Sequence, residues 1–481
     1  MNKIINGYNK LSKPTKASLW FIVSNVILKG ISFFTLPIFS RLLTPSEYGI
    51  VSVYNSWVAT ISIITTLTIW GGVFNVVMVK FEDDYKRIIS SFQGLATSIT
   101  IGFFIISCLF IREISNLSGM PQILVICMYL EILAQIPFNI WSTEQRYKFE
   151  YKNLILVTCL IAIISPLLGI IAVTSIPQKA EARVISNLVV CGIIGSVLFL
   201  YNQIKGRSFF SKKYWSYGFR FNIVLVPHYL STQILNQSDR IMINSMCGSN
   251  DAGIYSVAYN FALLLSLVTN GINSSLTPHI YQCMKGGDTK RLKKETTIIV
   301  LLVAVMALGL ICFVPDLFIF MLPESYYPAL RVIPPVTVGA FFLFLYPLFG
   351  SIEFYYEENK YVTYASVVGA VLNVILNYVF INLFGFIAAA YTTLACYMCF
   401  AICHYLFMTM ILKKNNKSNE IYDLKTISII SLGLIGVSFI MLILYDYMVV
   451  RWSVIVLILI ALFVFRKRII QVAKSLKKKD L

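Results

Sequence analysis

The chain has 481 residues, of which 58% are hydrophobic and only 13% are charged, and its formal net charge is +18. A soluble domain carries about 25% charged residues, and a chain of this length would need a large polar exterior in water, so the composition excludes an ordinary soluble protein. The positive charges lie in short clusters between apolar runs, which is the pattern that orients membrane proteins, and we therefore expect no nucleic-acid partner.

The N-terminal segment is basic, through Lys3, Lys10, Lys13 and Lys16, and leads into a long apolar stretch. No small-residue cleavage site follows a short apolar core, so we expect a first membrane span here and not a cleaved signal peptide. Apolar runs of about 20 residues, the length that crosses a bilayer, then recur along the chain. They predict about fourteen spans, at approximately 17–40, 48–77, 88–111, 121–141, 154–175, 184–204, 218–246, 252–278, 297–321, 331–355, 361–383, 386–412, 426–446 and 450–466.

Lysine and arginine alternate between the two sides of the predicted spans. Most of the 40 basic residues lie in the N-terminal segment, the C-terminal tail and every second loop. Cytoplasmic loops carry such an excess of basic residues. An even number of spans with this distribution predicts a multi-pass protein of the bacterial inner membrane with both termini in the cytoplasm.

A short repeat relates the two halves of the chain. The sequence GIVSV at residues 49–53 recurs as GIYSV at 253–257, and each copy opens the second span of a six-span set. Because six is an even number, we expect two parallel six-helix lobes facing each other across an axis along the membrane normal. The expected fold is an all-α polytopic membrane protein, with one lobe at 1–204, a second at 205–412, and two additional helices with a basic cytoplasmic tail at 413–481.

Polar residues mark one helical face of the first, seventh and eighth predicted spans. A charged group at mid-membrane costs a few kcal/mol on insertion scales, so its presence needs a reason. We expect these faces to converge on a central, hydrated, electropositive cavity. Polar contact between packed helices is the alternative for an isolated amide, and a local ion pair with Asp239 is the alternative for Arg240. The residues expected to line the cavity are Lys29 and Asn25 in the first span, Gln233, Asn236 and Arg240 in the seventh, and Asn270 and Asn273 in the eighth.

Three carboxylates within predicted spans, Asp239, Glu131 and Glu353, are candidate sites for coupling to H⁺ or Na⁺. A position near the membrane interface is the alternative for Glu131 and Glu353. The residues Cys396, Cys399, Cys403 and His404 have a spacing that suggests a metal site, but the same spacing gives one face of an apolar helix. We interpret them as packing residues and predict no metal and no other cofactor.

Three prolines, Pro37, Pro227 and Pro347, fall inside predicted spans and should kink them. The sequence contains no phosphate-binding loop, no HExxH motif and no large loop with paired carboxylates. We therefore predict that the protein is not an enzyme, neither an ATP-driven pump nor a membrane glycosyltransferase.

The stretch LPIFSRLLTPSEYG at residues 36–49 resembles the start of Wzx-type polysaccharide repeat-unit flippases. These belong to a larger superfamily that also holds the multidrug and toxin extruders and the lipid II flippases. The similarity continues through Asn236, residues 238–240 and residues 252–259. It implies alternating-access translocation of an undecaprenyl-diphosphate-linked oligosaccharide, destined for O-antigen or a related surface polysaccharide.

A diphosphate is anionic and is bound best by Lys or Arg. The resemblance therefore implies that Lys29, Arg240 and Arg41 make the cationic contacts to the substrate. It also implies membrane lipid, a polysaccharide polymerase and a chain-length regulator as partners. The alternative is a cation-coupled small-molecule or drug antiporter of the same fold, although an exporter of cationic drugs should place carboxylates where this sequence has Lys29 and Arg240. The sugar unit, the coupling ion, the oligomeric state and the choice between O-antigen and capsule stay open.

Overall fold

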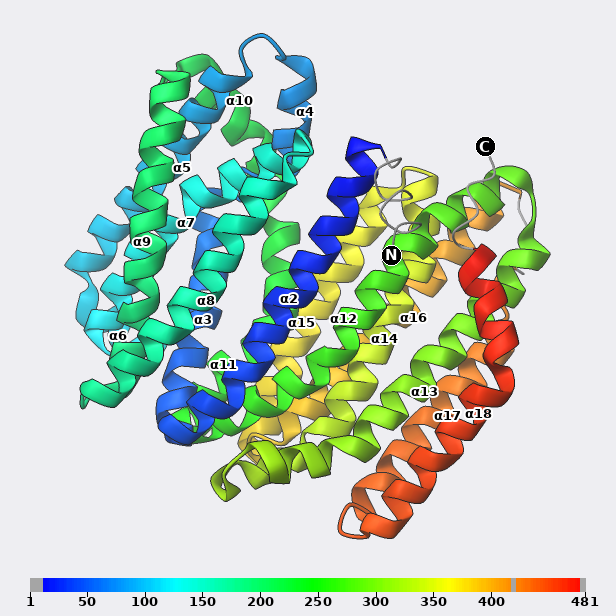
Figure 1. Cartoon of the computed structure of the whole chain (residues 1–481). Helices are drawn as coiled ribbons and strands as arrows, with labels where there is room; N and C mark the ends of the chain where they lie inside the picture. The colour runs from blue at the N-terminus through cyan, green and yellow to red at the C-terminus, as the bar shows by residue number, and fades with distance from the viewer. Residues whose placement is uncertain (1–11, 417–420, 476–481) are drawn as a thin grey trace, which may run out of the picture. The chain divides into compact units, whose positions relative to one another are not determined.

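The computed structural model describes residues 12–416 and 421–475, and every regular element in them is helical (Figure 1). The helices follow one another through short connections. They are α2 (Lys13–Leu42), α3 (Pro45–Thr66), α4 (Gly72–Lys80), α5 (Tyr85–Leu109), α6 (Ile111–Ser118), α7 (Gln122–Tyr147), α8 (Tyr151–Ser175), α9 (Lys179–Gly206), α10 (Lys212–Ile223), α11 (Val226–Cys247), α12 (Ser249–Gly286), α13 (Thr289–Met321), the 3₁₀ helix η1 (Glu324–Arg331), α14 (Ile333–Tyr355), α15 (Asn359–Phe384), α16 (Ala388–Lys414), α17 (Leu424–Ile443) and α18 (Met448–Ser475).

Within the described residues, twelve helices are long and apolar enough to cross a membrane. They coincide with twelve of the expected spans. The first and seventh expected spans coincide with α2 and α11, of 30 and 22 residues, which at 1.5 Å per residue reach about 45 and 33 Å. The predicted all-helical, polytopic membrane architecture is therefore confirmed.

The chain divides into two compact units. The first comprises the residues up to Gln233 together with Gly248–Gly253, and the second comprises Ile234–Cys247 and the residues from Ile254 onward. This division lies within α11 and at the start of α12. It falls later in the chain than the lobe boundary expected between residues 204 and 205.

The second expected span, 48–77, is interrupted. Helix α3 begins with a capping box, in which the Glu47 amide donates to the Thr44 hydroxyl at 3.3 Å and the Thr44 amide donates to the Glu47 carboxylate at 2.8 Å. It ends at Thr66 because Leu67 and Thr68 adopt left-handed backbone angles, with φ of 53° and 46°. Such angles are rare for residues with a side chain. The expectation of one continuous span was therefore wrong here, and α4 is a separate helix.

The seventh expected span, 218–246, is also divided. Residues 212–223 form α10, and α11 begins only at Val226. Pro227 thus lies in the first turn of α11, where its missing N–H leaves no helical hydrogen bond unmade. The expected kink at Pro227 was wrong, whereas Pro37 and Pro347 do lie inside α2 and α14.

The two repeat glycines lie against each other in the first unit. A Cβ atom on Gly49 would approach the Ser249 carbonyl oxygen to 1.8 Å, and one on Gly253 would approach the Pro45 carbonyl oxygen to 1.9 Å. The hydroxyls of Ser46 and Ser249 lie 2.6 Å apart beside this contact. Only glycine permits such a close approach of two helix starts, which gives the GIxSV repeat a physical reason.

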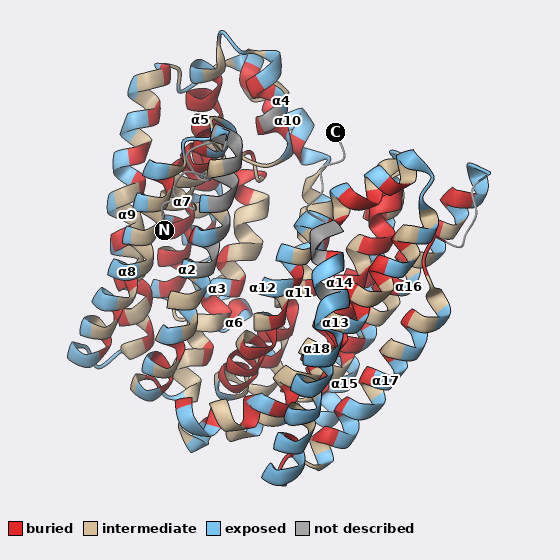
Figure 2. Cartoon of the chain, turned by 45° about the vertical axis from the view of Figure 1, so that its right-hand side comes forward, coloured by how far each residue is buried: buried red, intermediate tan, exposed pale blue. Residues whose placement is uncertain are grey.

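Burial differs strongly among the helices of the second unit. In α14, 83% of the most apolar window is buried, whereas in α18 the fraction is 6%. Helix α14 packs against α13 and α16, and α13 in turn packs against α17 and α18. Figure 2 shows α14 mostly buried and α18 mostly exposed. The second unit is therefore built around α14, with α18 at its exposed edge.

Candidate functional site

The second unit buries a carboxylate among hydrogen-bond donors from three other helices. Asp239 on α11 is 1% exposed. Its Oδ2 accepts from the Tyr255 hydroxyl at 2.6 Å and from the Thr393 hydroxyl at 2.7 Å. Its Oδ1 accepts from the Asn377 amide at 2.7 Å and from the Asn373 amide at 3.5 Å. We call these five residues the Asp239 network. It joins α11 to α12, α15 and α16 deep inside the unit.

Arg240 is buried next to this network but is not an ion-pair partner of Asp239. Its guanidinium lies 4.4 Å from the centre of the Tyr259 ring, and its Nη1 donates to the Asn236 carbonyl at 3.1 Å and to Gln237 Oε1 at 2.7 Å. The alternative of a local Asp239–Arg240 pair is therefore wrong. An aromatic face and carbonyl dipoles balance part of this buried charge, and no carboxylate among the described residues lies within ion-pair distance of it.

The first unit contains a network of similar chemistry, which we call the Glu131 network. Glu131 on α7 is 4% exposed. Its Oε2 accepts from the Tyr54 hydroxyl at 2.7 Å, and its Oε1 accepts from the amides of Gln135 at 3.0 Å and Asn187 at 3.1 Å. Asn187 Oδ1 in turn accepts from the Ser165 hydroxyl at 2.6 Å. These contacts tie α3, α7, α8 and α9 together.

Arg183 accompanies the Glu131 network as Arg240 accompanies the Asp239 network. It lies one turn before Asn187 on α9, and its guanidinium is 4.4 Å from the centre of the Phe39 ring. Its Nη1 is buried and makes no hydrogen bond to any residue that the structure describes. The sixth span is expected to begin at residue 184, so sequence reasoning left Arg183 outside the spans and missed it.

Glu353 and His404 form a third buried pair. The His404 Nδ1 lies 2.7 Å from Glu353 Oε1, and both side chains are fully buried. Within the described part of the chain, Glu353 Oε2 and His404 Nε2 have no hydrogen-bond partner. Both Glu131 and Glu353 are buried by protein, and a position near the membrane interface stays the alternative for each. His404, interpreted from the sequence as a packing residue, also makes this polar contact, and in the described part of the chain no three metal-binding side chains gather.

The other predicted site residues are distributed over both units. Lys29 is exposed on α2 and Arg41 is exposed in its last turn, while Gln233 is half-buried, all three in the first unit. In the second unit Asn236 accepts from the Tyr397 hydroxyl at 3.1 Å, Asn270 is exposed, and Asn273 has a buried Oδ1 with no hydrogen-bond partner. The side chain of Asn25 lies outside the described residues. The predicted central cavity stays a prediction.

Sequence reasoning identified the two acids but missed the groups that hold them. Asn373 and Asn377 are spaced by four in an apolar segment, and this spacing is the signal that could have revealed one polar helical face. Tyr54, Tyr255 and Thr393 carried no such signal, because isolated hydroxyls are common in membrane helices.

A charged cluster lies at the ends of α7 and α9. Buried Glu144 accepts from Lys148 Nζ at 2.5 Å and from Lys205 Nζ at 2.7 Å, and Lys148 also donates to the Tyr85 hydroxyl at 3.0 Å. Partial burial lowers the pKa of Lys148, but the hydrogen bonds to Glu144 and Tyr85 outweigh it and raise this pKa above its usual value. The cluster joins α5, α7 and α9 in the first unit.

Two family models and several known proteins match this sequence. A family model described as polysaccharide biosynthesis protein matches residues 15–284, and the MatE model matches residues 225–379. The chain is 24% identical over 371 residues to Lsg locus putative protein 1 of Haemophilus influenzae, which covers 75% of this chain and 90% of that protein. It is 22% identical over 305 residues to the succinoglycan biosynthesis transport protein ExoT of Rhizobium meliloti, covering 60% and 59% of the two chains.

A solved structure of similar fold is the lipid II flippase MurJ in an inward closed conformation. It aligns with a TM-score of 0.71 at 15% sequence identity, covering 94% of this chain and 99% of that one. At this identity the likeness establishes the fold. The polysaccharide biosynthesis model matches more than half of the chain, and it overlaps the stretch at 36–49 from which the resemblance was predicted. This multi-pass membrane protein belongs to the polysaccharide biosynthesis protein family.

Proposed function

We propose that the protein is a flippase for undecaprenyl-diphosphate-linked oligosaccharide repeat units. It moves them from the cytoplasmic to the outer leaflet of the inner membrane, where they enter O-antigen or a related surface polysaccharide. Family membership and the shared fold with a lipid II flippase support this proposal. So does the similarity to a succinoglycan biosynthesis transport protein. A polymerase and a chain-length regulator are the partners that this role implies.

The observation that carries the proposal is the buried Arg240. It lies on α11, which carries more polar residues than the neighbouring spans. Its side chain is 5% exposed and has no carboxylate partner among the described residues. Leaving a guanidinium buried without an anion is costly, so the position is suited to receiving one. A diphosphate offers such an anion and accepts paired hydrogen bonds from a guanidinium. Lys29 and Arg41 are the further cationic contacts in this proposal.

A drug antiporter remains the second candidate, because the chain buries carboxylates and matches the MatE model. A carboxylate that binds a cationic drug must have free acceptor positions. The oxygens of Asp239 instead receive four donors, and those of Glu131 receive three. This arrangement favours an anionic substrate over a cationic one.

We further propose that protons, and not sodium ions, couple at Asp239. A sodium ion needs several oxygen ligands with free lone pairs, whereas the Asp239 oxygens already receive four donors, and the side-chain oxygens of Asn373 and Asn377 also accept hydrogen bonds. A proton on Asp239 would instead compete directly with one donor. Protonation would therefore break a contact between α11 and a neighbouring helix, which is the kind of local change that can drive a conformational step.

The decisive experiment replaces Arg240 in a strain deleted for this gene and measures surface polysaccharide, with protein abundance checked in parallel. A charge-assisted contact contributes roughly 1.5–3 kcal/mol, so Arg240→Gln should lower the initial transport rate about 10- to 100-fold. Arg240→Lys should retain part of the activity. Arg220→Gln, at an exposed position on α10, is the matched control and should be silent.

The same strains distinguish the two candidates. Normal surface polysaccharide in Arg240→Gln, together with lost resistance to cationic drugs, would refute the flippase and favour the antiporter. For Lys29 the expected order of activity is wild type, Lys29→Arg, Lys29→Ala and Lys29→Glu, because Lys29→Glu sets like charges against each other. A fully active Lys29→Glu variant would show that Lys29 does not contact the anionic substrate.

A further inference from the structure

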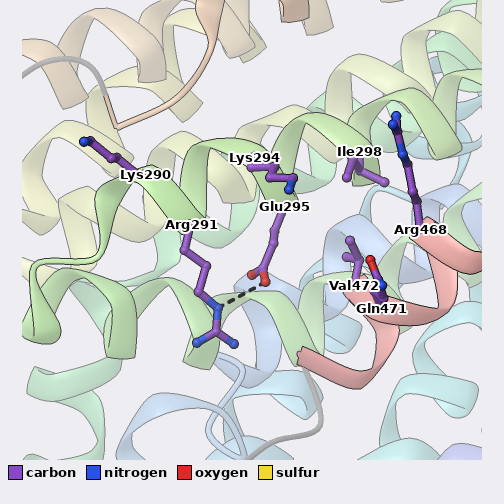
Figure 3. Close-up of a pocket in the computed structure, with 8 residues that line it drawn as sticks. All are labelled: Lys290, Arg291, Lys294, Glu295, Ile298, Arg468, Gln471 and Val472. Atoms are coloured by element: carbon purple, nitrogen blue, oxygen red, sulfur yellow. Dashed lines mark hydrogen bonds and ion pairs between the residues drawn. The ribbon is translucent and has the colours of Figure 1, made fainter.

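A basic pocket lies between the start of α13 and the end of α18, both in the second unit (Figure 3). Its volume is about 600 Å³, within the range of roughly 300–1,000 Å³ that is typical of small-ligand sites. The residues that line it are Lys290, Arg291, Lys294, Glu295, Ile298, Arg468, Gln471 and Val472. None of them belongs to the Asp239 network or to the Glu353–His404 pair.

The charges around the pocket do not balance. Its one carboxylate, Glu295, already accepts from Arg291 Nε at 3.1 Å and lies 2.5 Å from His279 Nε2. Nearby Asp288 caps α13 by accepting from the Arg291 amide. Lys290, Lys294 and Arg468 are left without a carboxylate partner among the described residues. Figure 3 shows Lys290 and Lys294 on α13 and Arg468 on the neighbouring helix. Three uncompensated cations around one pocket indicate an anionic ligand.

The surroundings of the pocket indicate a lipid. Ile298 and Val472 supply apolar walls. One turn before Arg468, Phe463 and Val464 are 65% and 64% exposed on α18, the helix with the least burial among the candidate spans. A ligand with a phosphate at one end and acyl chains at the other could place its chains along this face. The basic segments 285–294 and 466–468 also lie on the side that the charge distribution predicts to be cytoplasmic.

We propose that this pocket binds the phosphodiester headgroup of an anionic glycerophospholipid from the cytoplasmic leaflet. Basic pockets between membrane helices on this side recognise such headgroups by charge. The lysines and Arg468 hold the phosphate, and the Gln471 amide can donate to the headgroup. Because the ligand would contact both α13 and α18, it would fasten the weakly buried α18 to the second unit.

The test is native mass spectrometry of the purified full-length protein with added phosphatidylglycerol or phosphatidylethanolamine. A basic residue near an anionic lipid contributes about 1 kcal/mol, so the triple variant K290Q/K294Q/R468Q should bind phosphatidylglycerol at least about tenfold more weakly. Binding of zwitterionic phosphatidylethanolamine should be weak in both proteins. The charge-preserving variant K290R/K294R/R468K should bind like the wild type.

The matched control is K152Q/K212Q/R146Q, which removes the same charges from exposed residues in the first unit. These residues lie at or near the ends of α7, α8 and α10, on the side that the charge distribution predicts to be cytoplasmic. The control should bind phosphatidylglycerol like the wild type. Equal binding by the pocket variant and the wild type would overturn the proposal, and so would an equal loss in the control, which would show only non-specific attraction.

A free phosphate offers the same headgroup chemistry, so a second arm adds inorganic phosphate or glycerol phosphate in competition with the lipid. We expect neither to displace phosphatidylglycerol at equal concentration, because neither has acyl chains to place along α18. Saturation of the pocket by inorganic phosphate alone would assign the site to a soluble anion and overturn the lipid proposal. Both readouts are independent of transport activity.

Discussion

The Glu131 and Asp239 networks use the same chemistry in different positions. Each places a buried carboxylate against the hydroxyl of a tyrosine, Tyr54 or Tyr255, on a helix that opens with the GIxSV repeat. The acids themselves do not follow the repeat. Glu131 lies on the fourth expected span of its set, and Asp239 lies on the first of the other. In both units the tyrosine therefore lies on the helix that carries the repeat. The acid lies on helices that occupy different positions in the two six-span sets.

The two networks also differ in how many other helices donate hydrogen bonds to the acid. Asp239 has the shorter side chain and receives its donors from three other helices, whereas Glu131 receives one of its three from its own helix, through Gln135. Asp239 is also adjacent in sequence to the buried Arg240. A change at Asp239 therefore disturbs direct contacts with more helices than a change at Glu131, and it is next in sequence to the proposed substrate contact.

The largest expected effect concerns the close contact between the repeat glycines of the two tyrosine-bearing helices, Gly49 on α3 and Gly253 on α12. In Gly49→Ala and Gly253→Ala the new methyl group would meet a backbone carbonyl at under 2 Å, and neither backbone can move aside cheaply. We expect each variant to lose about 3 kcal/mol or more of stability and to yield little folded protein by size-exclusion chromatography. Gly271→Ala, where nothing lies within 4 Å, is the control and should fold normally. Normal yield of both repeat variants would contradict the close contact.

The next effect separates the two acids. In Asp239→Asn the amide oxygen can stay beside the donors of Asn373 and Asn377, but the NH2 group then faces the hydroxyls of Tyr255 and Thr393. Both hydroxyls must change from donor to acceptor, so we expect a loss of about 1–3 kcal/mol together with lost transport. Glu131→Gln should cost less, about 1 kcal/mol, because the new amide oxygen can stay beside the donors of Gln135 and Asn187, and only the Tyr54 hydroxyl must change from donor to acceptor. Thermal unfolding in detergent and surface polysaccharide measure the two effects. Equal losses from both substitutions would show that the two networks contribute equally to stability and to transport.

A smaller effect concerns the tyrosines. Double-mutant cycles pairing Tyr255→Phe with Asp239→Asn, and Tyr54→Phe with Glu131→Gln, measure each hydroxyl–carboxylate coupling directly. Interhelical hydrogen bonds in membranes average about 0.6 kcal/mol in such cycles, and we expect both couplings near this value. A coupling near zero for Tyr255 alone would place its hydroxyl outside the Asp239 network.

The smallest effect is expected outside both networks. Glu144→Gln removes the carboxylate that Lys148 and Lys205 share, but both lysines are partly exposed and can turn to solvent. We expect a loss of about 1 kcal/mol or less at neutral pH and unchanged transport. The pKa of Lys148 is raised in the folded protein, so its stabilising contribution is complete at neutral pH and is lost only as the pH rises through that raised value. Thermal unfolding at pH 7 measures this loss, and an equal loss at pH 10 checks that the contribution persists below the raised pKa.

The sequence predicted the helical architecture well because apolar run length is a local property that the bilayer imposes on each span. It failed where the backbone departs from a single helix, as at Leu67–Thr68, because the apolar run continues across the break, although Gly71 and Gly72 follow closely. It also located Glu131, Asp239 and Arg240, since a charge inside an apolar run is conspicuous. It could not find Asn187 or Arg183, because their roles depend on which helices pack together, and that is settled by tertiary contacts between distant segments.

The Ser46–Ser249 contact joins residues separated by 203 positions, and this separation bears on how the protein is made. Translation proceeds at about 5–20 residues per second, so the start of α3 leaves the ribosome roughly 10–40 s before its partner at the start of α12 exists. During that interval the glycine face of α3 is without the surface that it fits. The insertion machinery or surrounding lipid must cover it, and a chain released before residue 248 would leave that face permanently uncovered.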